Sequence, residues 1–259
     1  MTAIAAAPAK LDIGRVISTT FGVLRHNFLT FLGLTVLLVG LPLLIAGLGT
    51  IQLLGAGENG GTAMAGGFGL VGVSGLVALI TNAMLQGALV FGTVQALNGR
   101  QATFGECLAT GLRNFLPLIG LAIVMGLGVF AGLFIFLIPG VMIALAWFVA
   151  VPAKVTENIG VFSALGRSAD LTRDNRWLLL GLTLLFMVGS WVVSLALSPL
   201  SLIGMSGGPT AVVTTSVVVS TLGSIISSIV GSTGIAVTYT ELRRVKEGTD
   251  VNSLAALFD

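Results

Sequence analysis

Long apolar runs alternate with short polar segments along the whole chain. Six runs are almost free of Lys, Arg, Asp and Glu, and they lie at about residues 28–48, 68–97, 115–136, 140–156, 177–198 and 211–240. An apolar stretch of about 20 residues is long enough for a helix to cross the hydrocarbon core of a bilayer. A single helix through the third and fourth runs would be about twice too long, so we expect a turn at LIPG, residues 137–140. The pattern predicts an all-α integral membrane protein with six transmembrane helices.

Composition places the chain in the same class. Of the 259 residues, 55% are hydrophobic and 8% are charged, and the mean hydropathy is +1.07. A soluble domain carries about 25% charged residues, so this chain has too few to cover itself with a water-compatible surface. Residues 1–10 lack the apolar core of a signal peptide. We expect them to form a disordered tail, residues 11–248 to form the membrane domain, and residues 249–259 to form a cytoplasmic tail.

The twelve Lys and Arg residues follow the spans in a regular way. Three loops, at about 49–67, 137–139 and 199–210, contain none of them. All twelve lie before the first span, in or beside the two remaining loops, or after the last span: Lys10, Arg15, Arg25, Arg100, Arg113, Lys154, Arg167, Arg173, Arg176, Arg243, Arg244 and Lys246. Loops rich in Lys and Arg stay on the cytoplasmic side. The distribution predicts a multi-pass membrane protein with both termini in the cytoplasm.

One phrase occurs three times, as NFLTFLGL at 27–34, NFLPLIGL at 114–121 and NRWLLLGL at 175–182. Each copy follows a charged segment in which apolar residues recur at helical spacing. Such a segment is too short to span the membrane but amphipathic enough to lie in its interface. We therefore predict three repeats of an interfacial amphipathic helix plus a transmembrane hairpin. The repeat units cover about 11–98, 101–157 and 158–241.

The Asn that begins each copy stands where a surface helix should bend into a span. The new helix begins with unsatisfied backbone N–H groups, which a side-chain oxygen can cap. We expect Asn27, Asn114 and Asn175 to cap these junctions, and the Gly six residues after each Asn to let a neighbouring helix approach closely. Thr103 and Glu106 fit a capping box that begins the second surface helix.

Strong polar groups deep in the spans are confined to the second one. Asn82 and Gln86 lie one helical turn apart, and Gln95 follows nine residues later. These three residues either line a polar cavity or hydrogen-bond between helices, as Asn and Gln often do in membranes. In the sixth span, Gly223, Ser227 and Gly231 recur every four residues, a pattern typical of close helix packing within the bundle or in a homo-oligomer.

The charged residues beside the spans allow two interpretations. In the first, they contact anionic lipid headgroups or another membrane protein. The candidate contact residues are Arg15, Arg25, Arg113, Lys154, Glu157, Arg167, Arg173 and Arg176. In the second, the stretch from 151 to 177 is an ion-paired corner in which Glu157 meets Arg167 or Lys154.

Groups able to carry catalysis are scarce. The chain has one His, His26, and one Cys, Cys107, which is too few for a metal cluster or a disulfide framework. Ser74 lies in GVSG, but no His follows it on a later span to serve as its base. There is no phosphate-binding loop. We expect no enzymatic activity, no cofactor, no metal site and no nucleic-acid partner.

Scattered residues of the third repeat carry a family resemblance. They are Pro152, Ala153, Glu157, Ala164, Leu165, Arg167, Ser168, Leu171, Thr172 and Asn175. In these positions, and in TFGVLRHNFLTFLGL and TYTELRRVKEG, the chain resembles the glycerophosphoryl diester phosphodiesterase membrane-domain family of six-span bacterial inner-membrane proteins. Some members carry a soluble phosphodiesterase domain after the membrane part. This chain ends at Asp259, so we expect it to lack that catalytic domain.

Together these features predict a non-enzymatic membrane module. Its function would be to organise a membrane partner or to engage lipid through its cytoplasmic interfacial helices. The alternative is a transporter or permease for a small or amphiphilic solute, which would use Asn82 and Gln86.

Overall fold

The computed structural model describes residues 11–55, 60–204 and 207–247, so the predicted tails at 1–10 and 249–259 lie outside the described residues. Within these ranges every regular element is helical, which confirms the predicted all-α class. The elements are α1 (Ile13–Thr35), a π-helical turn η1 (Val36–Gly40), α2 (Leu41–Gly55), α3 (Gly60–Leu97), α4 (Phe104–Ile135), α5 (Leu137–Ala146), α6 (Ala150–Glu157), α7 (Val161–Thr172), α8 (Arg176–Gly204) and α9 (Gly208–Glu247).

Six helical stretches of the described residues are long and apolar enough to cross a membrane. They are Ile13–Leu53, Met64–Leu97, Phe104–Ile135, Leu137–Glu157, Arg176–Leu202 and Thr210–Glu247. Each contains one of the six predicted apolar runs almost completely. The prediction of six candidate spans is therefore confirmed in length and composition.

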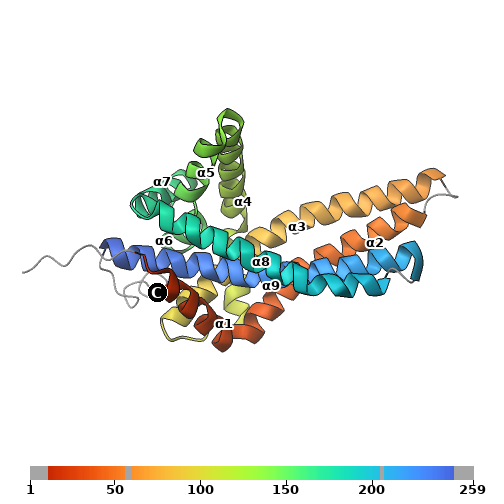
Figure 1. Ribbon diagram of the computed structural model, residues 1–259, viewed down its shortest axis with the longest axis horizontal. Coiled ribbons are helices and arrows are strands. Elements are labelled where there is room, and N and C mark those ends of the chain that lie inside the picture. Colours follow the sequence, from red (N-terminus) through yellow and green to blue (C-terminus); the bar gives the residue numbers. More distant parts are fainter. Residues whose placement is uncertain (1–10, 56–59, 205–206, 248–259) are drawn as a thin grey trace, which may run out of the picture.

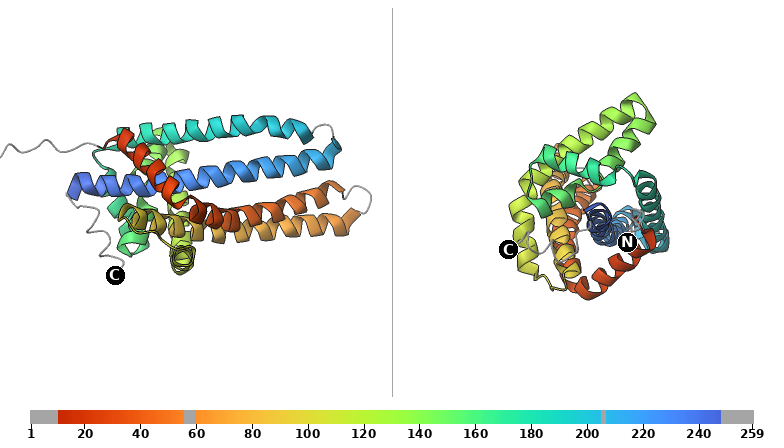
Figure 2. Two further views of the ribbon diagram at one scale, coloured as in Figure 1. Left: turned by 90° about the horizontal axis from the view of Figure 1, so that it is seen from below. Right: turned by 90° about the vertical axis from the view of Figure 1, so that its left-hand side faces the viewer.

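Four of these stretches run side by side. Figure 1 shows α2, α3, α8 and α9 along the long axis of the molecule, and we call them the four-helix bundle. The hairpin of α4 and α5 lies across this axis, and both views in Figure 2 show the same crosswise placement. We call the end of the bundle where α7 and the last turns of α9 lie the charged end. The hairpin projects from the bundle near that end (Figure 1).

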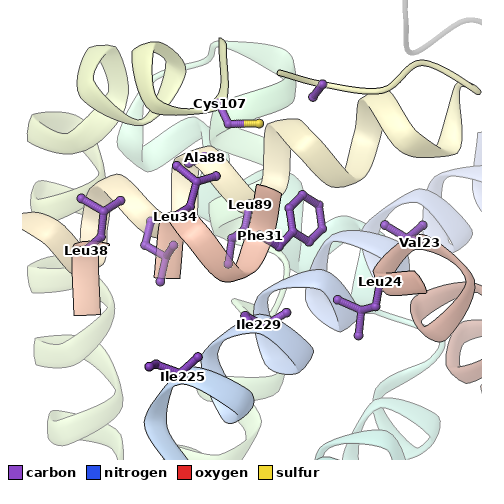
Figure 3. Packing of buried hydrophobic residues seen from close by; sticks show 12 residues of the cluster. Val23, Leu24, Phe31, Leu34, Leu38, Ala88, Leu89, Cys107, Ile225 and Ile229 are labelled. Carbon is purple, nitrogen blue, oxygen red and sulfur yellow. The ribbon is translucent and has the colours of Figure 1, made fainter. Parts of the chain in front are cut away.

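Buried apolar side chains from separate helices hold α1, α3 and α9 together (Figure 3). Phe31 and Leu34 of α1 are fully buried and pack with Leu89 of α3 and Ile229 of α9. Burying such side chains against one another gives dense packing, which drives helix association where lipid is as apolar as the side chains themselves. The first span is thereby fixed to the second and the sixth.

The first and third copies of the repeated phrase begin at a change of chain direction. In α1 the helix is kinked at Asn27, which has φ −118° and ψ 19°, and the preceding segment runs obliquely to the bundle (Figure 2). In the third copy, α7 ends at Thr172 and α8 begins at Arg176, with Asn175 in the turn between them. These are the bends that the sequence predicted.

At Asn114 the predicted bend is absent. Helix α4 continues through this position from Phe104 to Ile135, although Pro117 lies inside it. The reason is a tight crossing with α3 on both sides of Asn114: a Cβ on Gly111 would lie 2.4 Å from the Met84 carbonyl oxygen, and a Cβ on Gly87 would lie 3.3 Å from Leu118. Contacts before and after Asn114 fix one direction for the whole helix. The prediction of three equivalent units is unsupported at this junction and stays a prediction.

Close helix approach also occurs at a different place from the one predicted. A Cβ added at Gly33, Gly120 or Gly181 would meet its nearest neighbour at 3.5 to 4.0 Å, an ordinary contact distance. Close approaches to a neighbouring backbone occur at other glycines, among them Gly111 against α3, and Gly132 against Gly140 within the α4–α5 hairpin. The capping box, in contrast, is present: the Glu106 carboxylate accepts from the Thr103 N–H at 2.8 Å, and the Thr103 hydroxyl accepts from the Glu106 N–H at 3.3 Å.

Candidate functional site

A cluster of five polar side chains joins three helices at the charged end. The Arg167 Nε donates to both carboxylate oxygens of Glu157, at 2.9 and 3.1 Å, and the Tyr239 hydroxyl donates to Glu157 at 2.7 Å. The Arg243 Nε donates to Glu247 at 2.9 Å, and Arg167 also contacts Glu247. We call these residues the Glu157 cluster. Two guanidinium groups face two carboxylates, so the cluster is neutral and internally satisfied.

Local backbone geometry explains how Glu157 reaches this position. Helix α6 ends at Glu157, and Asn158 follows in the left-handed conformation with φ 47°. Asn is the residue that adopts this conformation most readily after Gly, and it ends a helix by reversing the chain. The reversal places α7 beside α6 and brings Arg167 to Glu157.

Further ion pairs surround the cluster. Glu241 pairs with Arg15 of α1 at 3.5 Å and with Arg244 at 2.8 Å, and the Lys246 ammonium lies 2.9 Å from the Asp174 carboxylate. The hydrogen bond and the charge of Lys246 hold the pKa of Asp174 below its usual value. These pairs connect α9 to α1 and to the turn before α8.

The pKa of Arg167, in α7, reflects two opposed effects. Burial disfavours the charged form and lowers this pKa. Hydrogen bonds to Glu157 and Glu247 oppose that effect more strongly, so the pKa of Arg167 lies above its usual value. Its guanidinium is therefore firmly charged and committed to the Glu157 cluster.

The ion-paired interpretation of residues 151–177 is confirmed for Glu157 and Arg167. No ion pair between Glu157 and Lys154 is present among the described residues, and Lys154 is only 6% exposed. Arg15 is likewise paired with Glu241. Half of the eight predicted lipid-contact or partner-contact residues are thus used inside the protein or buried.

The other four have no carboxylate within 4 Å among the described residues. Arg25, Arg113 and Arg173 are exposed, and Arg176 is partly exposed. Each lies within four residues of a strongly exposed apolar side chain in the sequence. These neighbours are Phe21 and Phe28 for Arg25, Leu112 and Leu116 for Arg113, and Trp177 for Arg173 and Arg176.

Asn82 and Gln86 line a cavity of about 380 Å³ between α3, α4 and α6, together with Leu118, Ile119 and Val151. Gln86 also accepts a hydrogen bond from the Ser232 hydroxyl of α9 at 3.1 Å. Both interpretations of this pair therefore have a structural counterpart, a cavity and an interhelical hydrogen bond. Gln95 does not line the cavity.

The three junction Asn side chains do not share one hydrogen-bond pattern. The amide nitrogens of Asn27 and Asn114 donate to the carbonyls four residues earlier, Val23 at 3.3 Å and Thr110 at 3.0 Å. This is the reverse of the expected cap, in which the side-chain oxygen accepts. At Asn175 the side-chain oxygen does accept, from the Leu11 N–H at 3.4 Å, which ties the start of the chain to the turn before α8.

His26, Ser74 and Cys107 each lie on a helix and show no hydrogen bond to one another among the described residues. The His26 ring nitrogen Nδ1 lies 3.0 Å from the Gly22 carbonyl, and the Ser74 hydroxyl donates to the Val71 carbonyl at 2.8 Å. Cys107 is buried in the apolar core (Figure 3). Within the part of the chain that the structure describes, no three His, Cys, Asp or Glu residues are grouped so as to hold a metal ion.

Sequence reasoning did not foresee the contribution of α9 to the Glu157 cluster. Tyr239, Arg243 and Glu247 stand four residues apart in TYTELRRVKEG, so they share one face of a helix. That spacing was the available signal. Nothing in the sequence shows that this face meets Glu157 and Arg167 from the middle of the chain.

Comparison with known proteins places the chain beside membrane proteins. No family model matches it, and no solved structure does. The UPF0259 membrane protein of Yersinia pestis (strain Pestoides F) is 28% identical over 125 residues, which is 45% of this chain and 49% of the relative. A UPF0259 membrane protein of Yersinia pseudotuberculosis serotype O:1b (strain IP 31758) matches to the same extent. The chain thus spans about half the length of the curated relatives it matches, and these relatives are named membrane proteins.

Proposed function

We propose that this protein is a non-enzymatic, multi-pass module of the inner membrane that engages anionic lipid through its surface helices. The observation that carries the proposal is the set of Arg25, Arg113, Arg173 and Arg176. These four have no carboxylate within 4 Å among the described residues, and each lies within four residues of an exposed apolar side chain in the sequence. We call them the four free arginines.

Physical chemistry favours lipid as the partner of such a set. An exposed apolar side chain enters the acyl region, while a nearby cation stays at the headgroup level. A cationic residue near an anionic membrane surface gains about 1 kcal/mol, and a guanidinium can hold phosphate oxygens with two parallel hydrogen bonds. The proposed orientation puts the charged end, and both termini, in the cytoplasm, where anionic lipid would meet these residues.

The comparisons support the coarser part of the proposal, since the relatives are named membrane proteins. The resemblance to the glycerophosphoryl diester phosphodiesterase membrane-domain family is the finer part and remains our proposal. Whether or not the chain belongs to that family, the proposed role is that of its membrane domain. This domain would bind lipid or a membrane partner and would catalyse no reaction.

Native mass spectrometry of the purified full chain tests lipid engagement. We expect more bound phosphatidylglycerol than phosphatidylethanolamine at equal lipid concentration, and a several-fold loss of this preference when the four free arginines are changed to Gln. Arg244→Gln is the matched control, because Arg244 is paired with Glu241. Equal binding of both lipids by the unchanged chain would show that the proposal is wrong.

A transporter for a small or amphiphilic solute is the second candidate function. The cavity lined by Asn82 and Gln86 favours it, because polar side chains facing a cavity within a span are a feature of solute pathways. Solute uptake that is lost in Asn82→Leu and Gln86→Leu, but retained when Arg25 and Arg113 are changed to Glu, would favour transport over lipid engagement.

A further inference from the structure

A crevice separates the crosswise hairpin from the bundle where α5 passes α8. Its volume is about 480 Å³. One wall is the apolar side of α5, with Leu137, Ile138, Val141, Met142 and Leu145, and the other wall is Trp177 and Leu180 of α8. The residues around its rim are Arg173, Asp174 and Arg176. The crevice is therefore apolar along its length and charged at one place.

The charged part of the crevice carries more positive than negative side chains. Asp174 is the acidic residue of the rim, and its carboxylate is engaged by Lys246 at 2.9 Å. Arg173 and Arg176 have no carboxylate within 4 Å among the described residues, although the charge of Arg173 also acts on Asp174. The Nε atom of Arg176 is in addition buried and has no hydrogen-bond acceptor in the part of the chain that the structure describes. A buried N–H of a charged group without an acceptor is unfavourable, so an acceptor that reaches Arg176 from outside the chain would be stabilising.

The apolar walls are open to the surrounding medium. Trp177 is 85% exposed and Ile138 is 76% exposed, and both belong to helical stretches apolar enough to lie in a membrane. Tryptophan at the boundary between charged and apolar residues is typical of the membrane interface. An occupant must therefore present a chain of hydrocarbon to α5 and α8, and an anion to Arg173 and Arg176.

We propose that this crevice is a binding site for a single phospholipid with an anionic headgroup. Its phosphate oxygens accept hydrogen bonds from Arg176 and Arg173, and one acyl chain lies between α5 and the first turns of α8. The proposal rests on the function proposed above and deepens it, because it assigns one site and one ligand class to two of the four free arginines. The other two, Arg25 and Arg113, then meet lipid only at the surface.

Tryptophan fluorescence can test the site directly. The three Trp residues are Trp147, Trp177 and Trp191. A variant that keeps only Trp177 reports on the crevice, while a variant that keeps only Trp191 reports on bulk lipid, because Trp191 lies on the same helix, is 78% exposed and does not line the crevice. Both full-length variants are placed in vesicles that carry a low fraction of acyl-brominated lipid, either phosphatidylglycerol or phosphatidylethanolamine.

We expect brominated phosphatidylglycerol to quench Trp177 preferentially, with an apparent preference of about five- to tenfold, as one charge-assisted contact provides. Trp191 should be quenched equally by both lipids. Arg176→Gln should remove most of the preference at Trp177, and Arg113→Gln, an exposed arginine away from the crevice, should leave it unchanged.

Three outcomes would overturn the site. Equal quenching of Trp177 by both lipids would exclude an anionic headgroup, and a preference that survives Arg173→Gln with Arg176→Gln would place the lipid elsewhere. Protection of Trp177 from both lipids would indicate that protein, such as a second copy of the chain, fills the crevice. If the whole chain still prefers phosphatidylglycerol in mass spectrometry, the proposed function stands and the crevice assignment alone fails.

Discussion

The Tyr239 hydroxyl donates a 2.7 Å hydrogen bond to the Glu157 carboxylate, across 82 residues of sequence. Tyr239 is fully buried in α9, and its ring also lies under the Arg243 guanidinium, 5.9 Å from ring centroid to carbon. This contact ties the last helix to the point where the chain reverses after α6. Through this contact, the Glu157 cluster fixes the position of α9 relative to α6 and α7.

Removing the charge of Glu157 should destabilise the fold. Glu157→Gln leaves Arg167 and Arg243 facing a neutral amide, and hydrogen bonds to charged groups contribute about 1.5–3 kcal/mol. We expect a loss of about 2 kcal/mol, measured as a lower thermal unfolding midpoint in one fixed detergent. Tyr239→Phe, which deletes one hydroxyl, should cost about 1 kcal/mol. Equal midpoints for Glu157→Gln and the unchanged protein would contradict this role.

The crossing of α3 and α4 should tolerate no side chain at Gly111. In Gly111→Ala the new Cβ would lie 2.4 Å from a backbone oxygen of α3, which cannot move aside as a side chain can. Overpacking of this kind costs about 1–3 kcal/mol. Gly126→Ala is the control on the same helix, because nothing lies within 4 Å of its Cβ position. It should stabilise α4 slightly, by up to about 1 kcal/mol, so thermal midpoints of the two variants should move in opposite directions.

The hydrogen bond between Gln86 and Ser232 should contribute measurably to packing within the spans. Such bonds contribute about 0.6 kcal/mol on average and up to about 2 kcal/mol. We expect Gln86→Leu and Ser232→Ala each to lower stability, and the double variant to lower it by less than the sum. Asn82→Leu should have little effect, because the Asn82 side chain makes no hydrogen bond to any residue that the structure describes. Additive losses in this double-mutant cycle, followed by unfolding in detergent, would argue against coupling.

Acid should weaken the contact between Asp174 and Lys246. The pKa of Asp174 is lower in the folded protein than in the unfolded chain, where it is about 3.9. Its contribution to stability is therefore complete above the unfolded pKa and is lost as pH falls through the folded pKa. Asp174→Asn should lower the thermal midpoint slightly at neutral pH, and its midpoint should decline less steeply than that of the unchanged protein as the pH falls below about 4. Parallel declines for both proteins would show that the pair contributes nothing to stability.

The crosswise hairpin makes a prediction about accessibility. If it lies as in Figure 1, its tip stays on the side of the charged end and does not reach the opposite end of the bundle. In intact cells, a membrane-impermeant thiol reagent should label Leu202→Cys, at the far end of α8, and should leave Ile138→Cys unlabelled. Cys107 is buried and gives a low background. Labelling of both positions would mean that α4 and α5 cross the membrane beside the other four helices, as the six spans predicted from the sequence require.

Much of the fold could be predicted because it depends on local properties of the sequence. Apolar runs such as 177–198 give spans, and the Thr103–Glu106 pair begins α4 as its spacing indicates. The ion pair between Glu157 and Arg167 could also be predicted, because the two residues are ten positions apart and one chain reversal brings them together. The hydrogen bond from Tyr239 to Glu157 could not be predicted, because the two residues lie far apart in the sequence.

By itself the sequence determined which segments are apolar enough for a membrane and where the cations gather, because transfer of a side chain from water depends mainly on its own chemistry. Only the tertiary structure decided the direction of α4 after Asn114, since that direction follows from contacts of Gly111 and Leu118 with α3. The tertiary structure also decided which arginines form ion pairs with carboxylates and which do not. It also determines that a crevice lies between α5 and α8. Both depend on distances between residues far apart in the chain, and no local pattern encodes them.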